Sequence, residues 1–375
     1  MYPRSELDAR IKRLKRWMGR KGVDLTLVSS CSNMLYLSGT AEAELFIVPL
    51  DGEPFLVAKY AFGDEIAKEM SPFHVEILKP YYGLSKKEII SPKAFDLIAE
   101  KFGKAKRIAV DFRSSEERVE KLRKRFKRGK KGAAVIDVED QLRRMREVKS
   151  EYEIELMKES ASIAIKAFES LDVKPGMTER EIANLLEFKM RELGADGPSF
   201  PSIVASGANS FNAHHVNTER RISENEILLM DFGARYRGYC SDMTRTFFIG
   251  KPPEKFLVRY DAVLNAQLRA LDYIRDGVPV ERPDIEARKV LKEAGLLEYY
   301  VHSLGHGIGI DIHEFLRLLV GKGGRLVKGM VVTDEPGIYI RGWGGIRVED
   351  TVVVGKDRGI PLTEKLSKNP DYLRR

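Results

Sequence analysis

The pattern of apolar residues divides the chain into two parts. Residues 10–21 repeat apolar positions at helical spacing among basic ones, which predicts an amphipathic helix. Short β-branched and apolar runs follow, as is typical of strands, at residues 25–28, 45–48, 54–58, 108–110 and 133–136. The pattern predicts an α/β domain over residues 1–140. A linker over residues 137–149 leads into a second domain over residues 141–375.

Long helices open the second part. Ser150 with Glu153, and Thr178 with Glu181, each form a capping-box pattern ahead of an apolar helical repeat. Pro175-Gly176 separates the two expected helices.

The same plan then recurs further along the chain. Helices are expected over residues 256–274 and 283–294, with Gly277 and Pro279 between them. Residues 173–194 and 277–295 therefore look like two copies of one helix–turn–helix unit, each followed by strands. The prediction is a quasi-twofold α/β shell.

A hairpin carrying two acids follows the first copy. Residues 227–248 form two strand-like runs around a turn that contains Gly238. Asp231 ends the first run and Asp242 begins the second. A buried acid is costly unless it is paired or bound to a cation, so a metal is one reason for both to be present. The alternative is a pair of surface acids at strand ends.

Further candidate ligands lie downstream in glycine-rich or strand-like contexts. They occur in His302-Ser-Leu-Gly-His306-Gly, in Asp334-Glu335-Pro-Gly and in Arg347-Val-Glu349. The ordered set resembles the five metal ligands of the pita-bread metallopeptidases, the family of methionine aminopeptidase, aminopeptidase P and prolidase: Asp231, Asp242, His306, Glu335 and Glu349. The resemblance spans about 200 residues.

This resemblance implies the fold and the cofactor. It implies an N-terminal creatinase-like α/β domain that shapes the substrate cleft and dimerises, followed by a pseudo-twofold pita-bread catalytic domain. Four carboxylates and one imidazole suit two divalent ions among Mn, Co, Fe and Zn. By resemblance, Asp242 and Glu349 bridge both ions, Asp231 chelates one, and His306 and Glu335 hold the other. Glu335 is also expected to carry a proton from water to the leaving nitrogen.

Histidine usage points to the same segments. Five of the six histidines lie in or near them. In proline-specific relatives, positions matching His214, His302 and His313 line the pocket and bind the scissile carbonyl or its oxyanion. Arg317 matches an arginine on the substrate's carboxyl side, and Arg347 one that braces a ligand.

The resemblance implies hydrolysis of the bond before proline in small peptides with proline at the second position. A dipeptidase (prolidase) is favoured, with an aminopeptidase P acting on longer peptides as the alternative. An alternative of another class is a catalytically silent pita-bread protein that binds through its basic surface. The chain departs from the family at Ala213 and Leu316, where proline is common, so substrate range is less constrained than metal binding.

Composition and charge argue against nucleic-acid-binding, membrane and disulfide-rich proteins. The 375 residues carry a net charge of +8, and the densest basic run, residues 121–131, lacks a nucleic-acid-binding pattern and is predicted to be a solvated helix face. No apolar run reaches the about 18 residues of a membrane helix. Two cysteines suit a reducing cytoplasm. Charged residues at 32% and scarce glutamine are typical of heat-adapted proteins.

Two short features allow a second interpretation. Cys240 is predicted to be a small buried thiol, with a redox-active thiol near the metals as the alternative. Residues 305–309 look faintly like a dinucleotide fingerprint, but the spacing differs and His306 is a ligand candidate.

Overall fold

The structure is a computed structural model that describes residues 2–78, 94–112, 115–126 and 132–371. The chain divides into two compact units, Met1–Arg146 and Glu147–Arg375. Among the described residues, the first unit has one sheet and one buried apolar cluster, whereas the second has four sheets and two such clusters.

The first unit is built on one six-stranded mixed sheet. Its strand order is β4-β3-β2-β1-β5-β6. Strands β1–β2 and β2–β3 pair antiparallel, whereas β1–β5, β3–β4 and β5–β6 pair parallel. The strands are β1 (Leu25–Val28), β2 (Leu45–Pro49), β3 (Phe55–Lys59), β4 (His74–Leu78), β5 (Arg107–Val110) and β6 (Ala134–Asp137). The five predicted strands are confirmed to within one residue, and β4 was missed.

Helices connect and flank these strands. They are α1 (Arg4–Lys21), α2 (Cys31–Ser38), α3 (Asp64–Met70), α4 (Ala94–Phe102), α5 (Glu116–Arg125) and α6 (Glu139–Glu147). Helix α1 begins six residues earlier than predicted. Leu7 is buried with Ile11, Leu14 and Met18, so the apolar face extends into that first turn. The basic run at residues 121–131 begins on α5, and its last five residues lie outside the described part of the chain.

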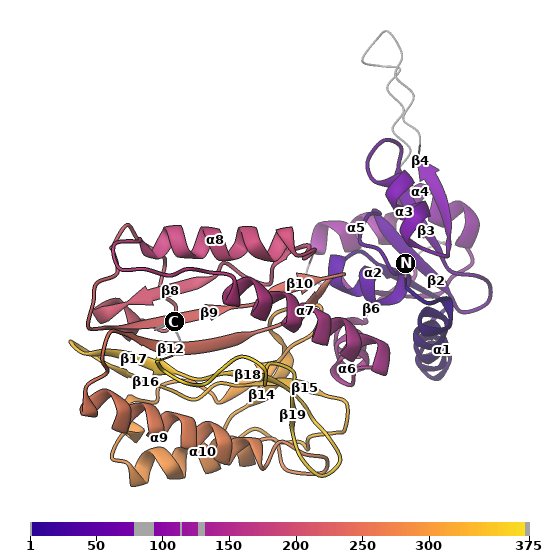
Figure 1. The fold of residues 1–375 in the computed structure, drawn as a ribbon. Coiled ribbons are helices and arrows are strands. Elements are labelled where there is room, and N and C mark those ends of the chain that lie inside the picture. Colours follow the sequence, from indigo (N-terminus) through magenta and orange to yellow (C-terminus); the bar gives the residue numbers. More distant parts are fainter. Residues whose placement is uncertain (1, 79–93, 113–114, 127–131, 372–375) are drawn as a thin grey trace. The chain divides into compact units, whose positions relative to one another are not determined.

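The second unit contains two helix pairs on opposite sides of its strands (Figure 1). One pair is α7 (Glu151–Glu169) and α8 (Glu179–Glu192), and the other is α9 (Glu254–Leu271) and α10 (Arg282–Glu293). Both predicted capping boxes are present, at Ser150 with Glu153 and at Thr178 with Glu181. The repeated helix–turn–helix plan is therefore confirmed.

The strands of this unit form two main sheets and two small ones. The first main sheet has the order β12-β9-β8 and the second β14-β13-β15-β18-β19. The first-half strands are β7 (Gly197–Pro198), β8 (Ile203–Ser206), β9 (Glu226–Phe232), β10 (Ala234–Tyr236), β11 (Tyr239–Cys240) and β12 (Met243–Ile249). The second-half strands are β13 (Gly305–Gly307), β14 (Glu314–Leu318), β15 (Val331–Asp334), β16 (Gly337–Ile340), β17 (Gly344–Arg347), β18 (Asp350–Val353) and β19 (Ile360–Pro361). Short 3-10 helices, η2 (Gly207–Phe211) and η3 (Leu297–Tyr299), lie in the connections.

The predicted hairpin over residues 227–248 is confirmed. Strands β9 and β12 pair antiparallel with Asp231 opposite Thr244. The chain reverses between β10 and β11, where Arg237 and Gly238 take positive φ angles of 46° and 82°. Positive φ at both turn residues matches the right-handed twist of the flanking strands.

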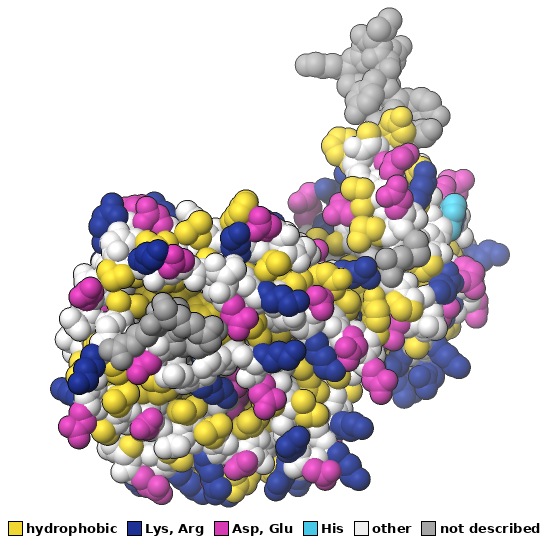
Figure 2. Space-filling view, in the orientation of Figure 1, with side chains coloured by type: hydrophobic (Ala, Val, Ile, Leu, Met, Phe, Trp, Pro, Cys, Tyr) yellow, Lys and Arg dark blue, Asp and Glu magenta, His cyan; other side chains and the backbone are white. Residues whose placement is uncertain are grey.

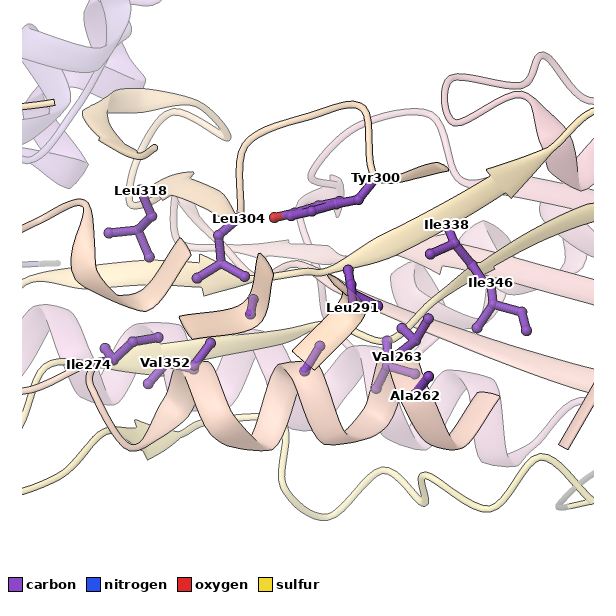
Figure 3. Packing of buried hydrophobic residues seen from close by; sticks show 14 of the residues in the cluster. Ala262, Val263, Ile274, Leu291, Tyr300, Leu304, Leu318, Ile338, Ile346 and Val352 are labelled. Atoms are coloured by element: carbon purple, nitrogen blue, oxygen red, sulfur yellow. The ribbon is translucent and has the colours of Figure 1, made fainter. Parts of the chain in front are cut away.

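Each helix pair packs on the strands that follow it. Figure 3 shows the second-half core, where Val263 of α9 and Leu291 of α10 lie toward Ile338 and Ile346, and Val352 lies beside Ile274. In the first half, α7 and α8 cover β8, β9 and β12 with a separate buried cluster. Two similar halves, each with a helix layer and a sheet layer, confirm the predicted quasi-twofold shell.

The face of the second unit that Figure 2 shows carries charges of both signs, and basic and acidic side chains are interspersed over it. Among the described residues, no helix combines the length and the apolar character needed to cross a bilayer.

Candidate metal centre

The five predicted ligands come from five separate places in the second unit. Asp231 lies on β9 and Asp242 directly precedes β12, so both belong to the first half. His306 lies on β13, while Glu335 directly follows β15 and Glu349 directly precedes β18. Strand ends from the two halves therefore converge on one region.

The convergence is close enough to hold a metal ion. Asp242, His306 and Glu349 offer ligand atoms that all lie within 4.8 Å of one another. His306 Nε2 lies 3.6 Å from Asp242 Oδ2 and 3.5 Å from Glu335 Oε1. Asp231 joins the group through Arg347, whose Nη2 donates to Asp231 Oδ2 at 2.6 Å.

The group carries more negative charge than its surroundings neutralise. Burial first, and then the charges of Glu349, Asp231 and Glu335, raise the pKa of Asp242 well above its usual value. Burial and the charges of Glu335 and Asp231 do the same to the pKa of Glu349. Burial raises the pKa of Glu335 to about 7. Closely spaced buried carboxylates of this kind call for cations.

Two oxygen atoms support the same inference directly. Asp231 Oδ1 and Asp242 Oδ1 are buried and have no hydrogen-bond partner among the described residues. Burial lowers the pKa of His306 to about 3, so its imidazole is neutral and able to act as a ligand. The donor set, four carboxylates and one neutral imidazole, fits divalent cations.

Threonine hydroxyls hold the ligands, and those of Thr244 and Thr351 do so across the interface of the two halves. Thr244 Oγ1 donates to Glu349 Oε2 at 2.6 Å, and the Glu349 amide donates to the Thr244 carbonyl at 3.1 Å. Thr351 Oγ1 similarly accepts from the Asp242 amide and donates to its carbonyl. Thr333 accepts from the His306 amide and donates to Glu335 Oε1, both at 3.0 Å.

A buried chain of hydrogen bonds connects His302 to Asp231. Arg347 donates through Nη2 to Asp231, through Nε to Thr244 at 2.9 Å and through Nη1 to Tyr339 Oη at 2.6 Å. Tyr339 Oη lies 3.0 Å from His302 Nε2, and His302 Nδ1 lies 2.8 Å from the Ser303 carbonyl. The predicted bracing by Arg347 thus has a geometric basis.

The same chain defines the state of His302. Burial lowers the pKa of His302 to about 4, so the ring is neutral. A carbonyl only accepts, so Nδ1 carries the proton and Nε2 accepts from Tyr339. To donate to a substrate carbonyl, His302 would have to release Tyr339 and take up a proton at Nε2. Sequence reasoning missed Tyr339, because a tyrosine on a strand carries no signal of its own.

The other pocket candidates lie at the exposed side of the centre. The His313 ring is 4.3 Å from the His306 ring, centroid to centroid, and Arg317 pairs with His306 across β13 and β14. Burial, then Arg317 and His214, lower the pKa of His313. His214 also contributes to the lowered pKa of His302, so it lies within electrostatic reach of both rings. The structure therefore places His302, His313 and Arg317 beside the ligand group, with His214 within electrostatic reach of the two histidines.

The two short features with alternative interpretations are explained by packing. Cys240 is fully buried, and burial raises the pKa of its thiol to about 12, which fits an inert buried thiol. A Cβ on Gly305 would lie 2.0 Å from the Thr333 carbonyl oxygen. The glycine is thus required by the close approach of β13 to β15 and not by a nucleotide.

Comparisons with known proteins cover both units. The family model for metallopeptidase family M24 matches residues 155–356, and that for the creatinase/prolidase N-terminal domain matches residues 10–148.

Relatives match along almost the whole chain. An Xaa-Pro dipeptidase from Pyrococcus furiosus is 34% identical over 360 residues, covering 96% of this chain and 98% of the relative. An X-Pro aminopeptidase from Thermotoga maritima is 31% identical with a TM-score of 0.85, covering 96% of this chain and 99% of that structure. An Xaa-Pro dipeptidase from Bacillus anthracis is 32% identical with a TM-score of 0.86, covering 97% and 99%.

Proposed function

The chain belongs to metallopeptidase family M24, and on that premise we propose that it hydrolyses the peptide bond before proline in small peptides, as an Xaa-Pro dipeptidase. The family model matches more than half of the chain, and the resemblance drawn from the ordered ligand residues is thereby confirmed. Full-length relatives named for Xaa-Pro hydrolysis support the substrate class.

One observation carries the proposal: carboxylates from both halves converge with a neutral imidazole in a buried group whose charge is not balanced. A protein that had kept the fold without the chemistry would not need this costly arrangement. The silent binding protein considered above is therefore the weaker alternative.

We propose two divalent ions per chain, among Mn, Co, Fe and Zn, held by Asp231, Asp242, His306, Glu335 and Glu349. Four carboxylate charges exceed what one divalent cation neutralises: even with the buried Arg347 guanidinium on Asp231 counted, a single ion would leave one charge uncompensated. When bound, the ions supply Lewis acidity toward the peptide carbonyl and the attacking water. Arg347 keeps Asp231 in place, and Thr244 does the same for Glu349.

The chain's own residues then handle the proton and the substrate. Glu335 is positioned by Thr333 on Oε1, which leaves Oε2 to take a proton from water and pass it to the leaving nitrogen. The proline nitrogen has to gain this proton to leave as an amine. His214 and His313, on the exposed side, and His302 behind them line the pocket that holds the scissile carbonyl.

The preference for dipeptides rests on Arg317. Its exposed side chain lies on β14 directly opposite His306, where it is able to bind the free carboxylate of a product proline. The alternative is an aminopeptidase P that accepts longer peptides, and a relative of that name from Thermotoga maritima supports it.

Further properties belong to the same proposal. We propose a homodimer formed through the first domain, expected over residues 1–140, and a cytoplasmic, heat-adapted protein. The 64 basic and 56 acidic residues in one chain support heat adaptation, because ion pairs contribute more at high temperature.

The test uses metal-depleted protein reconstituted with Mn²⁺ or Co²⁺. We expect no activity without metal and release of proline from Leu-Pro after reconstitution. The kcat/KM on Leu-Pro should exceed that on Leu-Pro-Pro, and Arg317→Leu should lower it for the dipeptide far more than for the tripeptide. A tenfold preference for the longer peptide, about 1.4 kcal/mol, would indicate aminopeptidase P. Absent peptidase activity with tight, salt-dependent binding of nucleic acid would indicate the silent binding protein.

A further inference from the structure

Glu179 is a fully buried acid that plays no part in the chemistry described above. It is the first residue of α8, a position where an acid is normally solvated, yet none of its surface is exposed. A carboxylate buried to this extent needs several hydrogen bonds to remain ionised.

Each carboxylate oxygen of Glu179 accepts three hydrogen bonds. Those on Oε1 come from the Ser206 amide (2.9 Å), Ser206 Oγ (2.7 Å) and Asn209 Nδ2 (3.0 Å). Those on Oε2 come from the Thr218 amide (3.1 Å), Thr218 Oγ1 (2.6 Å) and His215 Nε2 (2.8 Å). One side chain thus joins the two ends of the loop at residues 206–218.

The six groups are all able to donate, so they select the ionised carboxylate. Burial by itself raises the pKa of Glu179, but the hydrogen bonds from Thr218, His215, Asn209 and Ser206 outweigh it and lower the pKa to about 2. Gln at this position would turn an NH₂ group toward donors on one side and leave them without an acceptor.

The loop is also held on its other side. The Gly345 amide of β17 donates to Ser210 Oγ at 2.8 Å, and a Cβ on Gly345 would lie 2.1 Å from the Ser210 carbonyl oxygen. Strand β17 ends at Arg347, the residue that holds Asp231. The loop is therefore held by Glu179 on one side and, on the other, by β17, whose last residue, Arg347, binds Asp231.

His214 and His215 lie within this clamped loop and differ in environment. The ring of His215 is bound to Glu179, whereas His214 is exposed and lies within electrostatic reach of His302 and His313. Anchoring His215 fixes the backbone of its neighbour, and so the direction in which His214 leaves the loop.

We propose that Glu179 is a positioning residue: through His215 and the two ends of the loop, it sets where His214 stands in the substrate pocket. The inference rests on the proposed function, in which His214 contacts the substrate. Misplacing a substrate-contacting group by about 1 Å costs on the order of 100-fold in rate. A loss of this kind should depend on His214 being present.

The test is a double-mutant cycle on metal-loaded enzyme with Glu179→Gln, His214→Ala and the double variant. We expect Glu179→Gln to lower kcat/KM on Leu-Pro by about 30-fold, mainly through kcat, with metal content unchanged. In the His214→Ala background, the same change should cost no more than about threefold. Equal losses in both backgrounds would overturn the proposal and leave Glu179 with a purely structural role.

A matched control separates positioning from stability. Glu286 on α10 is also a buried acid, 2% exposed, and binds Arg269, Arg282 and Lys289. Glu286→Gln should leave kcat/KM within about threefold of the parent, because no pocket residue depends on it. If Glu179→Gln does not fold, His215→Phe removes a single donor and enters the same cycle.

An NMR measurement tests the positioning role without any activity. With six histidines, each ring Cε1–H signal can be assigned by substitution in the zinc-loaded protein. Glu179→Gln should shift or broaden the His214 signal and leave that of His306 in place. An unchanged His214 signal would overturn the inference. An inactive parent with the expected shift would instead contradict only the proposed function.

Discussion

Each half of the second unit has a buried acid in the first turn of a helix that anchors a neighbouring segment. The two anchored segments differ in how many other contacts hold them. Glu179 lies in the first turn of α8, and Asp284 lies in the first turn of α10. Both are fully buried, and each accepts hydrogen bonds from a segment that carries proposed pocket histidines. Asp284 accepts from Tyr300 Oη at 3.0 Å, the Val320 amide at 3.1 Å and Arg288 Nε at 2.9 Å.

The segments that these acids hold differ in how else they are fixed. Residues 300–320 include the paired strands β13 and β14, and Glu314 forms a buried ion pair with Lys149 at 3.0 Å. The loop at residues 206–218 contains one short 3-10 helix, and six of its hydrogen bonds go to Glu179. Gly345 and the side chain of Asn217 hold the loop at further points. A ladder distributes the restraint over many backbone hydrogen bonds, whereas the loop places a large share of it on one side chain. The halves should therefore respond differently to equivalent substitutions.

The largest effect should come from removing one acid from each half, because the metal centre needs both. Asp242→Asn and Glu349→Gln should each lower kcat/KM by at least about a thousandfold, with loss of bound metal. Elemental analysis and kinetics after reconstitution measure both effects. Full metal retention without Glu349 would contradict its assignment as a ligand.

Without metal, the same two variants should be more stable than the parent. Burial and the neighbouring carboxylates raise the pKa of Asp242 and Glu349, so the folded metal-free protein keeps protons that the unfolded chain has released. The associated stability is complete below the unfolded pKa of about 4 and is lost as pH rises through the folded pKa. Urea unfolding at neutral pH in chelator should show a higher midpoint for Glu349→Gln.

A smaller effect is expected from the proposed pocket histidines of the second half. His302→Ala and His313→Ala should lower kcat by about 10- to 100-fold while metal content stays near that of the parent, because neither ring is a proposed ligand. Tyr339→Phe, which removes the donor to His302 Nε2, is the informative partner variant. Loss of metal in His313→Ala would move that residue into the ligand set.

The smallest effect separates the two anchoring acids. Asp284→Asn should lower kcat/KM by only about threefold, against about 30-fold for Glu179→Gln, because β13 and β14 keep their pairing without it. A larger loss for Asp284→Asn than for Glu179→Gln would reverse the contrast drawn between the halves.

The pH dependence of the free energy of unfolding tests the role of the Glu179 carboxylate independently of activity. The folded pKa of Glu179 is about 2, below its ordinary value of 4.5, so its contribution is present above pH 4.5 and lost as pH falls toward 2. Unfolding free energy measured over that range should therefore fall less steeply in Glu179→Gln than in the parent. An unchanged slope would mean that the carboxylate is not ionised in the folded protein.

Short-range features, and the order of the candidate ligands along the chain, could be predicted from the sequence. Capping boxes at Ser150 and Thr178, the apolar helical repeats and the hairpin around Gly238 are short-range features, and all are present in the structure. The ordered ligand candidates could also be recognised, because each lies in a short glycine-rich or strand-like segment. Strand β4 was not, because its buried and exposed positions follow no clear alternation.

Only the tertiary structure assigned partners to the remaining residues. Glu179 reads as an ordinary first-turn acid, and its burial depends on groups 27–39 positions away that fold back onto it. Tyr339 gains its place between His302 and Arg347 because β16 and β17 pair beneath the metal centre. Periodicity records which face of an element is buried. Which polar groups become hydrogen-bond partners is decided by packing between segments that are distant in sequence. Burial there makes each donor or acceptor without a partner costly in free energy.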